Sequence, residues 1–287
     1  MKPKPEWLRI RHTDAPDRAV VEKILEDLNL NTVCKEAMCP NYLECFARKT
    51  ATFMILGTNC TRNCRFCNVR HAKPQPPDPN EPDNIAGAVK KLELSYVVIT
   101  SVTRDDLPDG GANHFAKVIG AIKKSAPGTV IEVLIPDLNG DVNLLKIITD
   151  ASPSVISHNM ETVFALYSDV RPQAEYTRSL HLLENIKKLN PTIHSKSGFM
   201  VGLGESKVQV LELLDDLRLV GCEFLTIGQY LAPSKEHYPI REYIHPHIFD
   251  EYGAIAKEKG FHFVASAPLV RSSYRADEAI KESSQSS

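Results

Sequence analysis

The stretch Ala51-Thr-Phe-Met-Ile-Leu-Gly57-Thr-Asn-Cys60-Thr-Arg-Asn-Cys64-Arg-Phe-Cys67 joins an apolar run to three closely spaced cysteines. Its first six residues are apolar or β-branched and end at a glycine, which predicts a strand buried on both faces over residues 51–56. The cysteines follow in the spacing C-x3-C-x2-C. Parallel α/β folds place their chemistry at the carboxyl ends of their strands, so we expect a site at the end of this strand.

Strand and helix patterns alternate along the rest of the chain. Apolar runs predict further strands over residues 95–101, 129–135, 154–158, 196–201, 223–227 and 261–265. Apolar spacing of i, i+3, i+4, i+7 predicts helices around residues 20–28, 85–92, 115–122 and 210–217. Six or seven βα units in about 220 residues predict a partial, TIM-like barrel of the (β/α)6 type. A doubly wound sheet is the alternative, because periodicity does not give the order of the strands.

We expect three parts in the chain. Residues 1–50 form an N-terminal extension with a helix, residues 51–265 form the barrel, and residues 266–287 form a C-terminal segment whose end, after Ala279, is disordered. A proline-rich stretch over residues 74–82 predicts an extended linker inside the barrel part.

Composition excludes several classes of protein. The chain has 287 residues, of which 43% are hydrophobic and 24% charged, with a net charge of −2. This balance gives no overall basic field for nucleic acid or an anionic membrane. No apolar run approaches the roughly 18 residues of a membrane span, and the first residues lack a signal-peptide core, so we expect a cytosolic protein.

The cysteines are concentrated in one region. Six of the seven lie between residues 34 and 67, and only Cys222, which we expect to pack in the core, stands apart. In a cytosolic protein such a cluster indicates metal or redox chemistry more often than disulfides. Three thiolates can ligate three irons of a [4Fe–4S] cube and leave the fourth iron open to a small molecule. Zinc is the alternative, but it commonly needs a second short-spaced pair, which the sequence lacks.

Cys60, Cys64 and Cys67, with the aromatic Phe66 before the last of them, resemble the signature of the radical S-adenosylmethionine enzymes. The resemblance implies that these three cysteines hold a [4Fe–4S] cluster and that S-adenosylmethionine binds its open iron. Electron transfer from the cluster would cleave S-adenosylmethionine and yield a 5′-deoxyadenosyl radical.

A second set of cysteines indicates one particular family among these enzymes. Cys34, Cys39 and Cys45 have the spacing C-x4-C-x5-C, and Arg-Ser-Ser-Tyr follows at residues 271–274. The combination resembles the lipoyl synthase family over nearly the whole chain. It implies an auxiliary [4Fe–4S] cluster, held by the three cysteines and Ser273, that donates sulfur. Ser272 is the less favoured ligand.

The resemblance also implies contacts to S-adenosylmethionine at the ends of three strands. Thr100 and Ser101 would hold its methionyl part, and Asn159 and Glu161 its ribose. Gly202 and Glu205 belong to a loose G-x-I-x-G-x-x-E pattern near the adenine, with Met200 in place of isoleucine. A plain strand-to-helix turn would also explain these glycines.

The activity implied is that of a sulfurtransferase of lipoate biosynthesis, which inserts sulfur at C6 and C8 of an octanoyl group on a lysine of a lipoyl carrier domain. Implied partners are the lipoyl domains of 2-oxoacid dehydrogenase complexes or the glycine cleavage H protein, an electron donor such as ferredoxin or flavodoxin, and an iron–sulfur cluster carrier. A methylthiotransferase and a zinc-stabilised binding module are the alternatives.

Basic residues also surround the second cysteine triplet: Arg62, Arg65, Arg70, His71 and Lys73. They would raise the cluster potential, meet an acidic lipoyl domain, or simply be solvated. His245 and His247 are expected in a loop that enters a helix.

Overall fold

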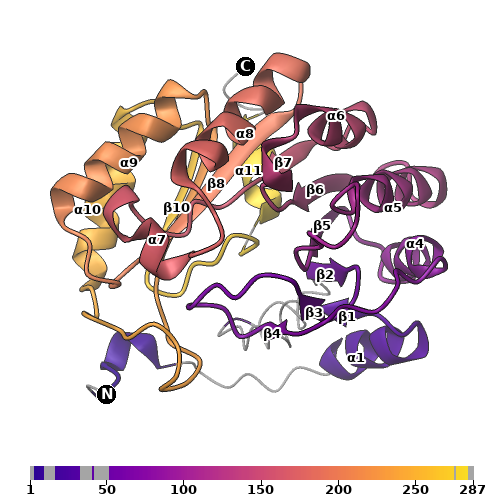
Figure 1. Cartoon of the computed structure of the whole chain (residues 1–287), viewed down its shortest axis with the longest axis horizontal. Coiled ribbons are helices and arrows are strands. Elements are labelled where there is room, and N and C mark those ends of the chain that lie inside the picture. Colours follow the sequence, from indigo (N-terminus) through magenta and orange to yellow (C-terminus); the bar gives the residue numbers. More distant parts are fainter. Residues whose placement is uncertain (1–2, 10–16, 33–40, 42–51, 275, 284–287) are drawn as a thin grey trace. The chain divides into compact units, whose positions relative to one another are not determined.

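The computed structural model describes residues 3–9, 17–32, 41, 52–274 and 276–283 (Figure 1). Cys34, Cys39 and Cys45 lie outside the described residues. The chain divides into two compact units. The N-terminal unit comprises Arg11–Arg62 and Asn68–Ile156, and the C-terminal unit comprises Met1–Ile10, Asn63–Cys67 and Ser157–Ser287.

The N-terminal unit carries strands in the order β1-β2-β5-β6-β7. Their bounds are β1 (Asn31–Thr32), β2 (Thr52–Ile55), β5 (Tyr96–Ser101), β6 (Val130–Leu134) and β7 (Val155–Ser157). β2, β5 and β6 pair in parallel, and β1 pairs with β2 antiparallel. The helices are α1 (Asp17–Asp27), α4 (Glu81–Lys91), α5 (Ala112–Ser125), η2 (Leu138–Gly140) and α6 (Val142–Asp150). β3 (Asn59–Cys60) and β4 (Arg70–His71) form a separate small parallel sheet.

The C-terminal unit carries three parallel strands, β8 (His194–Val201), β9 (Phe224–Gln229) and β10 (Phe263–Ser266). Its helices are η1 (Glu6–Leu8), η3 (Phe164–Leu166), α7 (Tyr167–Val170), α8 (Tyr176–Leu189), α9 (Lys207–Leu219), α10 (Pro246–Glu258) and α11 (Ala276–Ser283). In each unit the parallel strands follow one another in chain order. A doubly wound sheet would reverse direction at a switch point, so this order favours the barrel type.

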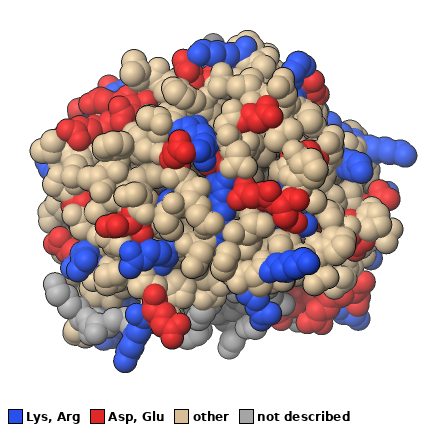
Figure 2. All heavy atoms as spheres, viewed as in Figure 1, with Lys and Arg blue, Asp and Glu red and all other residues tan. Residues whose placement is uncertain are grey.

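The predicted α/β class with a mainly parallel sheet is confirmed, because apolar strands are buried on both faces. Every residue of β9 is buried, as are all but the last of β5. In Figure 1, helices α4, α5 and α6 lie next to one another along the strands of the N-terminal unit. Acidic and basic side chains are interspersed on the face that Figure 2 shows. None of the helices formed by the described residues is long and apolar enough to cross a membrane.

Two local predictions were wrong. The linker expected over residues 74–82 is shorter, because Pro82 already belongs to the first turn of α4, where a missing backbone N–H costs no hydrogen bond. The tail expected to be disordered after Ala279 is helical as far as Ser283, since α11 buries Ala276 and Ala279. The part boundaries expected at residues 50 and 265 stay a prediction.

The prediction for Cys222 was confirmed, and that for the two histidines was confirmed for His245 only, because His247 already lies in α10. Cys222 is fully buried, and burial raises the pKa of its thiol to about 12. His245 precedes α10, and its side chain accepts a hydrogen bond from the backbone N–H of His247 at the start of that helix.

Candidate active site

Cys60 lies at the end of the short strand β3, in the loop that follows β2. Its Sγ accepts backbone N–H groups from Thr103 (3.3 Å) and Arg62 (3.4 Å). Cys60, Cys64 and Cys67 are all half-buried, and none of them forms a disulfide in the described part of the chain. Hydrogen bonds to a ligating sulfur raise the potential of an iron–sulfur cluster, so the surroundings of Cys60 suit a cluster ligand.

The loop after β5 is bound to this cysteine loop through Thr61. The backbone N–H and the Oγ1 of Thr61 both donate to the carbonyl of Thr103, at 3.1 and 3.0 Å. Thr61 Oγ1 also accepts the backbone N–H of Asp105 at 3.1 Å. The segment that supplies an N–H to Cys60 is therefore held at several points.

Arg62 forms the centre of an ion-pair network next to Cys60. Its Nε and Nη2 bind both carboxylate oxygens of Asp105, at 2.7 and 2.9 Å. Nη2 also lies 2.7 Å from an oxygen of Asp137 and 2.7 Å from Oδ1 of Asn139. Burial by itself would lower the pKa of Arg62, but Asp105 and Asp137 raise it above its ordinary value. The guanidinium thus joins the loops after β5 and β6 to the cysteine loop as a permanent cation.

Of the alternatives for the basic segment, simple solvation is wrong for Arg62. The side chain of Arg62 is only 4% exposed, and that of Asp137 is 0% exposed. Arg65, Arg70, His71 and Lys73 are exposed, and their role stays open.

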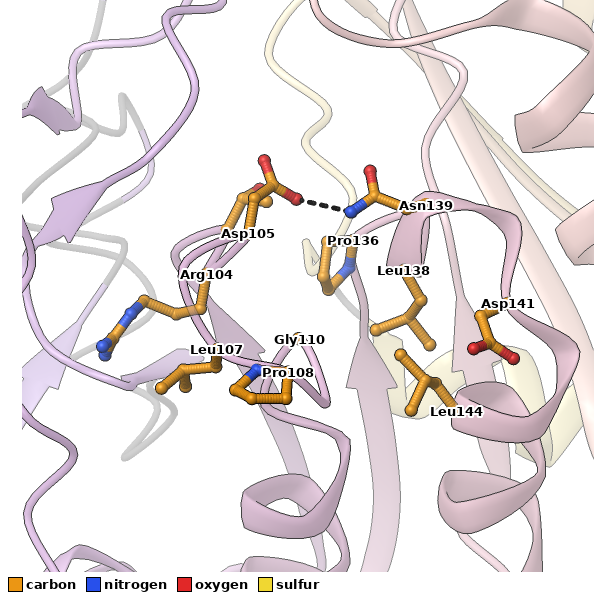
Figure 3. Close-up of a pocket in the computed structure, with 11 residues that line it drawn as sticks. Arg104, Asp105, Leu107, Pro108, Gly110, Pro136, Leu138, Asn139, Asp141 and Leu144 are labelled. Atoms are coloured by element: carbon orange, nitrogen blue, oxygen red, sulfur yellow. Dashed lines mark hydrogen bonds between the residues drawn. The ribbon is translucent and has the colours of Figure 1, made fainter.

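A pocket of about 160 Å³ lies beside this network in the N-terminal unit (Figure 3). The loops after β5 and β6 form its walls, with Leu107 and Pro108 from one and Pro136 and Leu138 from the other. Asn139 Nδ2 donates to Asp105 Oδ1 at 3.2 Å, so the two loops are joined at the pocket.

The segment with Cys64 and Cys67 belongs to the C-terminal unit and is held there by other contacts. The backbone N–H of Arg65 donates to Val170 O (3.0 Å), and its carbonyl accepts from Tyr238 N (2.7 Å). Phe66 packs against an apolar cluster that includes Val170 and Tyr238. Phe66 therefore anchors this segment within the C-terminal unit.

Thr100 and Ser101 end strand β5. Thr100 Oγ1 donates to Leu134 O at 3.0 Å, which satisfies that hydroxyl within the sheet. Ser101 Oγ is buried and has no hydrogen-bond partner among the described residues. A buried polar atom without a partner is costly, so Ser101 is suited to a bound polar ligand.

Asn159 and Glu161 follow β7 and contact each other. Asn159 Nδ2 donates to Glu161 Oε1 at 3.0 Å, while Asn159 Oδ1 is buried without a partner in the described part of the chain. Glu161 has a φ of 68°, an uncommon conformation for a non-glycine residue that is concentrated at functional sites. Burial raises the pKa of Glu161, and the charges of Arg171 and Arg271 oppose this rise.

Gly202 and Glu205 form the turn between β8 and α9. The carboxylate of Glu205 accepts the backbone N–H groups of Gly202 (2.6 Å) and Leu203 (2.9 Å). Gly202 has a φ of 97°, and a Cβ there would lie 2.2 Å from Gln229 Nε2. Both residues therefore shape this turn, and their contact to adenine stays a prediction.

Ser273 lies in a turn that a hydrogen bond from Tyr274 N to Arg271 O closes at 2.9 Å. Its three predicted partner cysteines lie outside the described residues. Within the described residues, no group of three or more His, Cys, Asp or Glu side chains is arranged around a single metal ion. The thiolates of a cube ligate different irons and do not converge on one point, so the assignment of Cys60, Cys64 and Cys67 stays a prediction.

Sequence reasoning missed Asp105, Asp137 and Asn139. All three follow predicted strands at the carboxyl end, and this position was the available signal. Their common partner, Arg62, could not be read from spacing alone.

Comparison with known proteins first gives the class. The radical SAM superfamily matches residues 54–217, so the chain belongs to that superfamily. Its fold resembles HydG, a maturase of the [FeFe]-hydrogenase (TM-score 0.61, 14% identity, 96% of this chain and 61% of that one). It also resembles methylornithine synthase (TM-score 0.55, 14% identity, 77% and 72%). These likenesses concern the fold alone and support the partial-barrel prediction.

Within this superfamily, the chain belongs to the lipoyl synthase family. It is 59% identical to the lipoyl synthase of Caldicellulosiruptor saccharolyticus over 278 residues, which cover 97% of this chain and 98% of that protein. It is 55% identical to that of Alkaliphilus metalliredigens over 282 residues, covering 98% and 97%. The chain is therefore a radical S-adenosylmethionine sulfurtransferase with two [4Fe–4S] clusters, and the methylthiotransferase and zinc-module alternatives fall away.

Proposed function

We propose that this chain inserts two sulfur atoms, at C6 and C8, into an octanoyl group bound to a lysine of a lipoyl carrier domain. The observation that carries the proposal is the identity of more than half of the residues with curated lipoyl synthases along nearly the whole chain. Two equivalents of S-adenosylmethionine are consumed for each lipoyl group, one for each hydrogen atom removed.

Cys60, Cys64 and Cys67 would hold the cluster that supplies the electron for cleavage of S-adenosylmethionine. The donor set fits this role, because it offers three thiols outside any disulfide, and Cys60 accepts two backbone N–H groups. Arg62 and Thr61 keep the N–H donor of Thr103 at that sulfur through their contacts to the loop after β5.

Buried polar atoms without partners support the contacts proposed for S-adenosylmethionine. Ser101 Oγ and Asn159 Oδ1 are such atoms in the described structure, and a bound ligand would satisfy them. Ser101 and Thr100 would position the methionyl part, and Asn159 and Glu161 the ribose. The turn built by Gly202 and Glu205 would border the adenine.

The auxiliary cluster would be held by Cys34, Cys39, Cys45 and Ser273 and would be the source of the inserted sulfur. A serine oxygen is a harder ligand than a thiolate, which suits a corner of the cluster that must become labile. Because sulfur leaves this cluster, we propose that an iron–sulfur carrier rebuilds it and that a ferredoxin or flavodoxin supplies electrons.

The test uses the anaerobically reconstituted chain with an octanoyl-lysine peptide. We expect about eight irons and eight sulfides per chain. We also expect 5′-deoxyadenosine together with a doubly thiolated product. Stoichiometric zinc without iron would contradict the proposal.

Two substitutions separate the roles of the two cysteine sets. Cys64→Ser should abolish formation of 5′-deoxyadenosine, because the first cluster loses a ligand. Cys39→Ser should retain cleavage of S-adenosylmethionine but eliminate sulfur insertion. A Cys39→Ser chain that still forms lipoyl product would show that the sulfur donor is assigned wrongly.

A further inference from the structure

The segment that carries Ser273 lies directly against strands of the C-terminal unit. The backbone N–H of Ala267 donates to Ile227 O at 3.2 Å, and that of Gln229 donates to Pro268 O at 3.1 Å. The chain after β10 therefore continues to pair with the end of β9 before it turns toward Ser273.

Gly228 lies between these two pairing residues of β9, and its missing side chain leaves room for the segment. A Cβ at Gly228 would lie 2.2 Å from the carbonyl oxygen of Val270 and 3.1 Å from Nη1 of Arg271. The first distance is far inside van der Waals contact, and the obstructing atom belongs to the backbone. A glycine inside a strand commonly marks such a close approach of another backbone.

Short contacts lead from this point to Ser273. The backbone N–H of Val270 donates to Ala267 O at 3.1 Å, and Val270 is itself buried. Arg271 Nη1 donates to the Val270 carbonyl at 2.6 Å, on the same oxygen that faces Gly228. Tyr274 N then donates to Arg271 O and closes the turn in which Ser273 lies. A displacement of the Val270 carbonyl would therefore move the serine.

We propose that Gly228 is a positioning residue for Ser273: its missing side chain lets the Val270 carbonyl lie on β9 and so sets the position of the serine hydroxyl. This inference rests on the proposed function, in which Ser273 completes the ligand set of the auxiliary cluster. Gly228 touches neither a cluster nor a substrate in this proposal, and it acts only through residues 270–274.

The proposal predicts that a change at Gly228 affects sulfur insertion but not cleavage of S-adenosylmethionine. The residues proposed for cleavage of S-adenosylmethionine belong to other segments, namely the cysteine loop and the ends of β5, β7 and β8. A shift of the Ser273 turn should weaken the auxiliary cluster and leave cleavage nearly intact. A purely structural role of Gly228 would reduce both activities together.

The experiment compares Gly228→Ala with the unaltered chain, both at full length and reconstituted anaerobically, on an octanoyl-lysine peptide. We measure 5′-deoxyadenosine, thiolated product and iron per chain. The ratio of thiolated product to 5′-deoxyadenosine should fall about tenfold, as overpacking at a buried position predicts, while 5′-deoxyadenosine formation stays within about twofold. Gly120→Ala on α5 is the matched control, because no atom outside the adjoining backbone of α5 lies within 4 Å of its added Cβ.

Ser273→Ala is measured in parallel to keep the two proposals apart. If Ser273→Ala loses sulfur insertion and Gly228→Ala keeps the full product ratio, the positioning role is wrong and the proposed function stands. If Ser273→Ala itself keeps the product, the ligand assignment is wrong, and the inference about Gly228 falls with it. An equal loss of product and 5′-deoxyadenosine in Gly228→Ala also overturns the inference.

Arg271→Gln provides a second variant that adds no atom at β9. It removes the hydrogen bond from Arg271 Nη1 to the Val270 carbonyl, and also the charge of Arg271 that acts on Glu161, so the product ratio and not the amount of 5′-deoxyadenosine is the readout. This ratio should fall about threefold, in line with the loss of one hydrogen bond. This variant tests the same chain of contacts even if Gly228→Ala does not accumulate in folded form. An unchanged ratio in Arg271→Gln would then overturn the inference.

Discussion

A charged side chain lies near the carboxyl end of β5 and another near that of β8, and the two charges are stabilised by different kinds of partner. In the N-terminal unit, the charge of Arg62 is buried against the side chains of Asp105, which follows β5, and Asp137, which follows β6. After β8, in the C-terminal unit, the charge of Glu205 is held by backbone N–H groups of Gly202 and Leu203. The first arrangement depends on partners far apart in sequence, and the second on the local path of the backbone.

The difference predicts how each region responds to substitution. Removing one member of a buried ion pair leaves the other charge without compensation, which is strongly destabilising. Removing a carboxylate that is held by backbone amides leaves only neutral N–H donors without an acceptor. A neutral side chain with an oxygen can restore most of these hydrogen bonds. Three experiments test this contrast.

The largest effect is expected for Arg62→Met. It removes the guanidinium that contacts the carboxylate of Asp137, which is 0% exposed, and we expect a loss of about 3–5 kcal/mol in the free energy of unfolding. Urea unfolding measures the loss. The control is Arg104→Met, because the carboxylate partner of Arg104, Asp106, is 38% exposed and stays hydrated. Equal losses in the two variants would contradict the role given to burial of Asp137.

The second test measures how stability depends on pH. It uses Glu223, a carboxylate of the C-terminal unit that is held by side chains as well as by the backbone. Its Oε2 lies 3.0 Å from Lys187 Nζ and accepts the backbone N–H of Ser195 at 3.0 Å. Burial alone would raise the pKa of Glu223, but His194, Lys187 and the Ser195 N–H lower it to about 2.

A lowered carboxyl pKa stabilises the fold above the unfolded value of 4.5, and this stabilisation is lost as the pH falls toward 2. Glu223→Gln should therefore cost about 3 kcal/mol at pH 7 and about half of that or less at pH 3. Urea midpoints of both chains at the two pH values measure the difference. A cost independent of pH would show that the carboxylate is not stabilised by its charge.

The smallest effect is expected for Glu205→Gln. The amide keeps one oxygen for the N–H groups of Gly202 and Leu203, so the loss should be about 1–2 kcal/mol, that of one unsatisfied buried donor. Burial raises the pKa of Glu205, so the folded state already disfavours its charge, and the substitution relieves part of that cost. Thermal unfolding at pH 7 measures the loss. A loss as large as that of Arg62→Met would remove the contrast between the two regions.

The comparison also shows which features a sequence makes visible. The strands were predictable because residues such as those of β5 and β9 form apolar runs that end in polar or glycine residues, and both strands lie within two residues of the predicted bounds. The helix α11 was missed because its stability comes from burial of Ala276 and Ala279, which composition does not show. The polar residues after Ala279 indicated disorder instead of a helix.

By itself, the sequence determined the fold class and the chemistry, because periodicity and the spacing of cysteines are local properties of the chain. Cys60, Cys64 and Cys67 lie within eight residues, so one loop can hold their cluster. Only the tertiary structure decided which charged side chains pair with each other and at which glycine another backbone approaches too closely for a side chain. Arg62 contacts Asp105, which is 43 residues away in the sequence, and Asn139, which is 77 residues away. Gly228 of β9 lies against the carbonyl of Val270, in the segment after β10. Such contacts depend on how strands are ordered and packed in space, and no local pattern encodes that order.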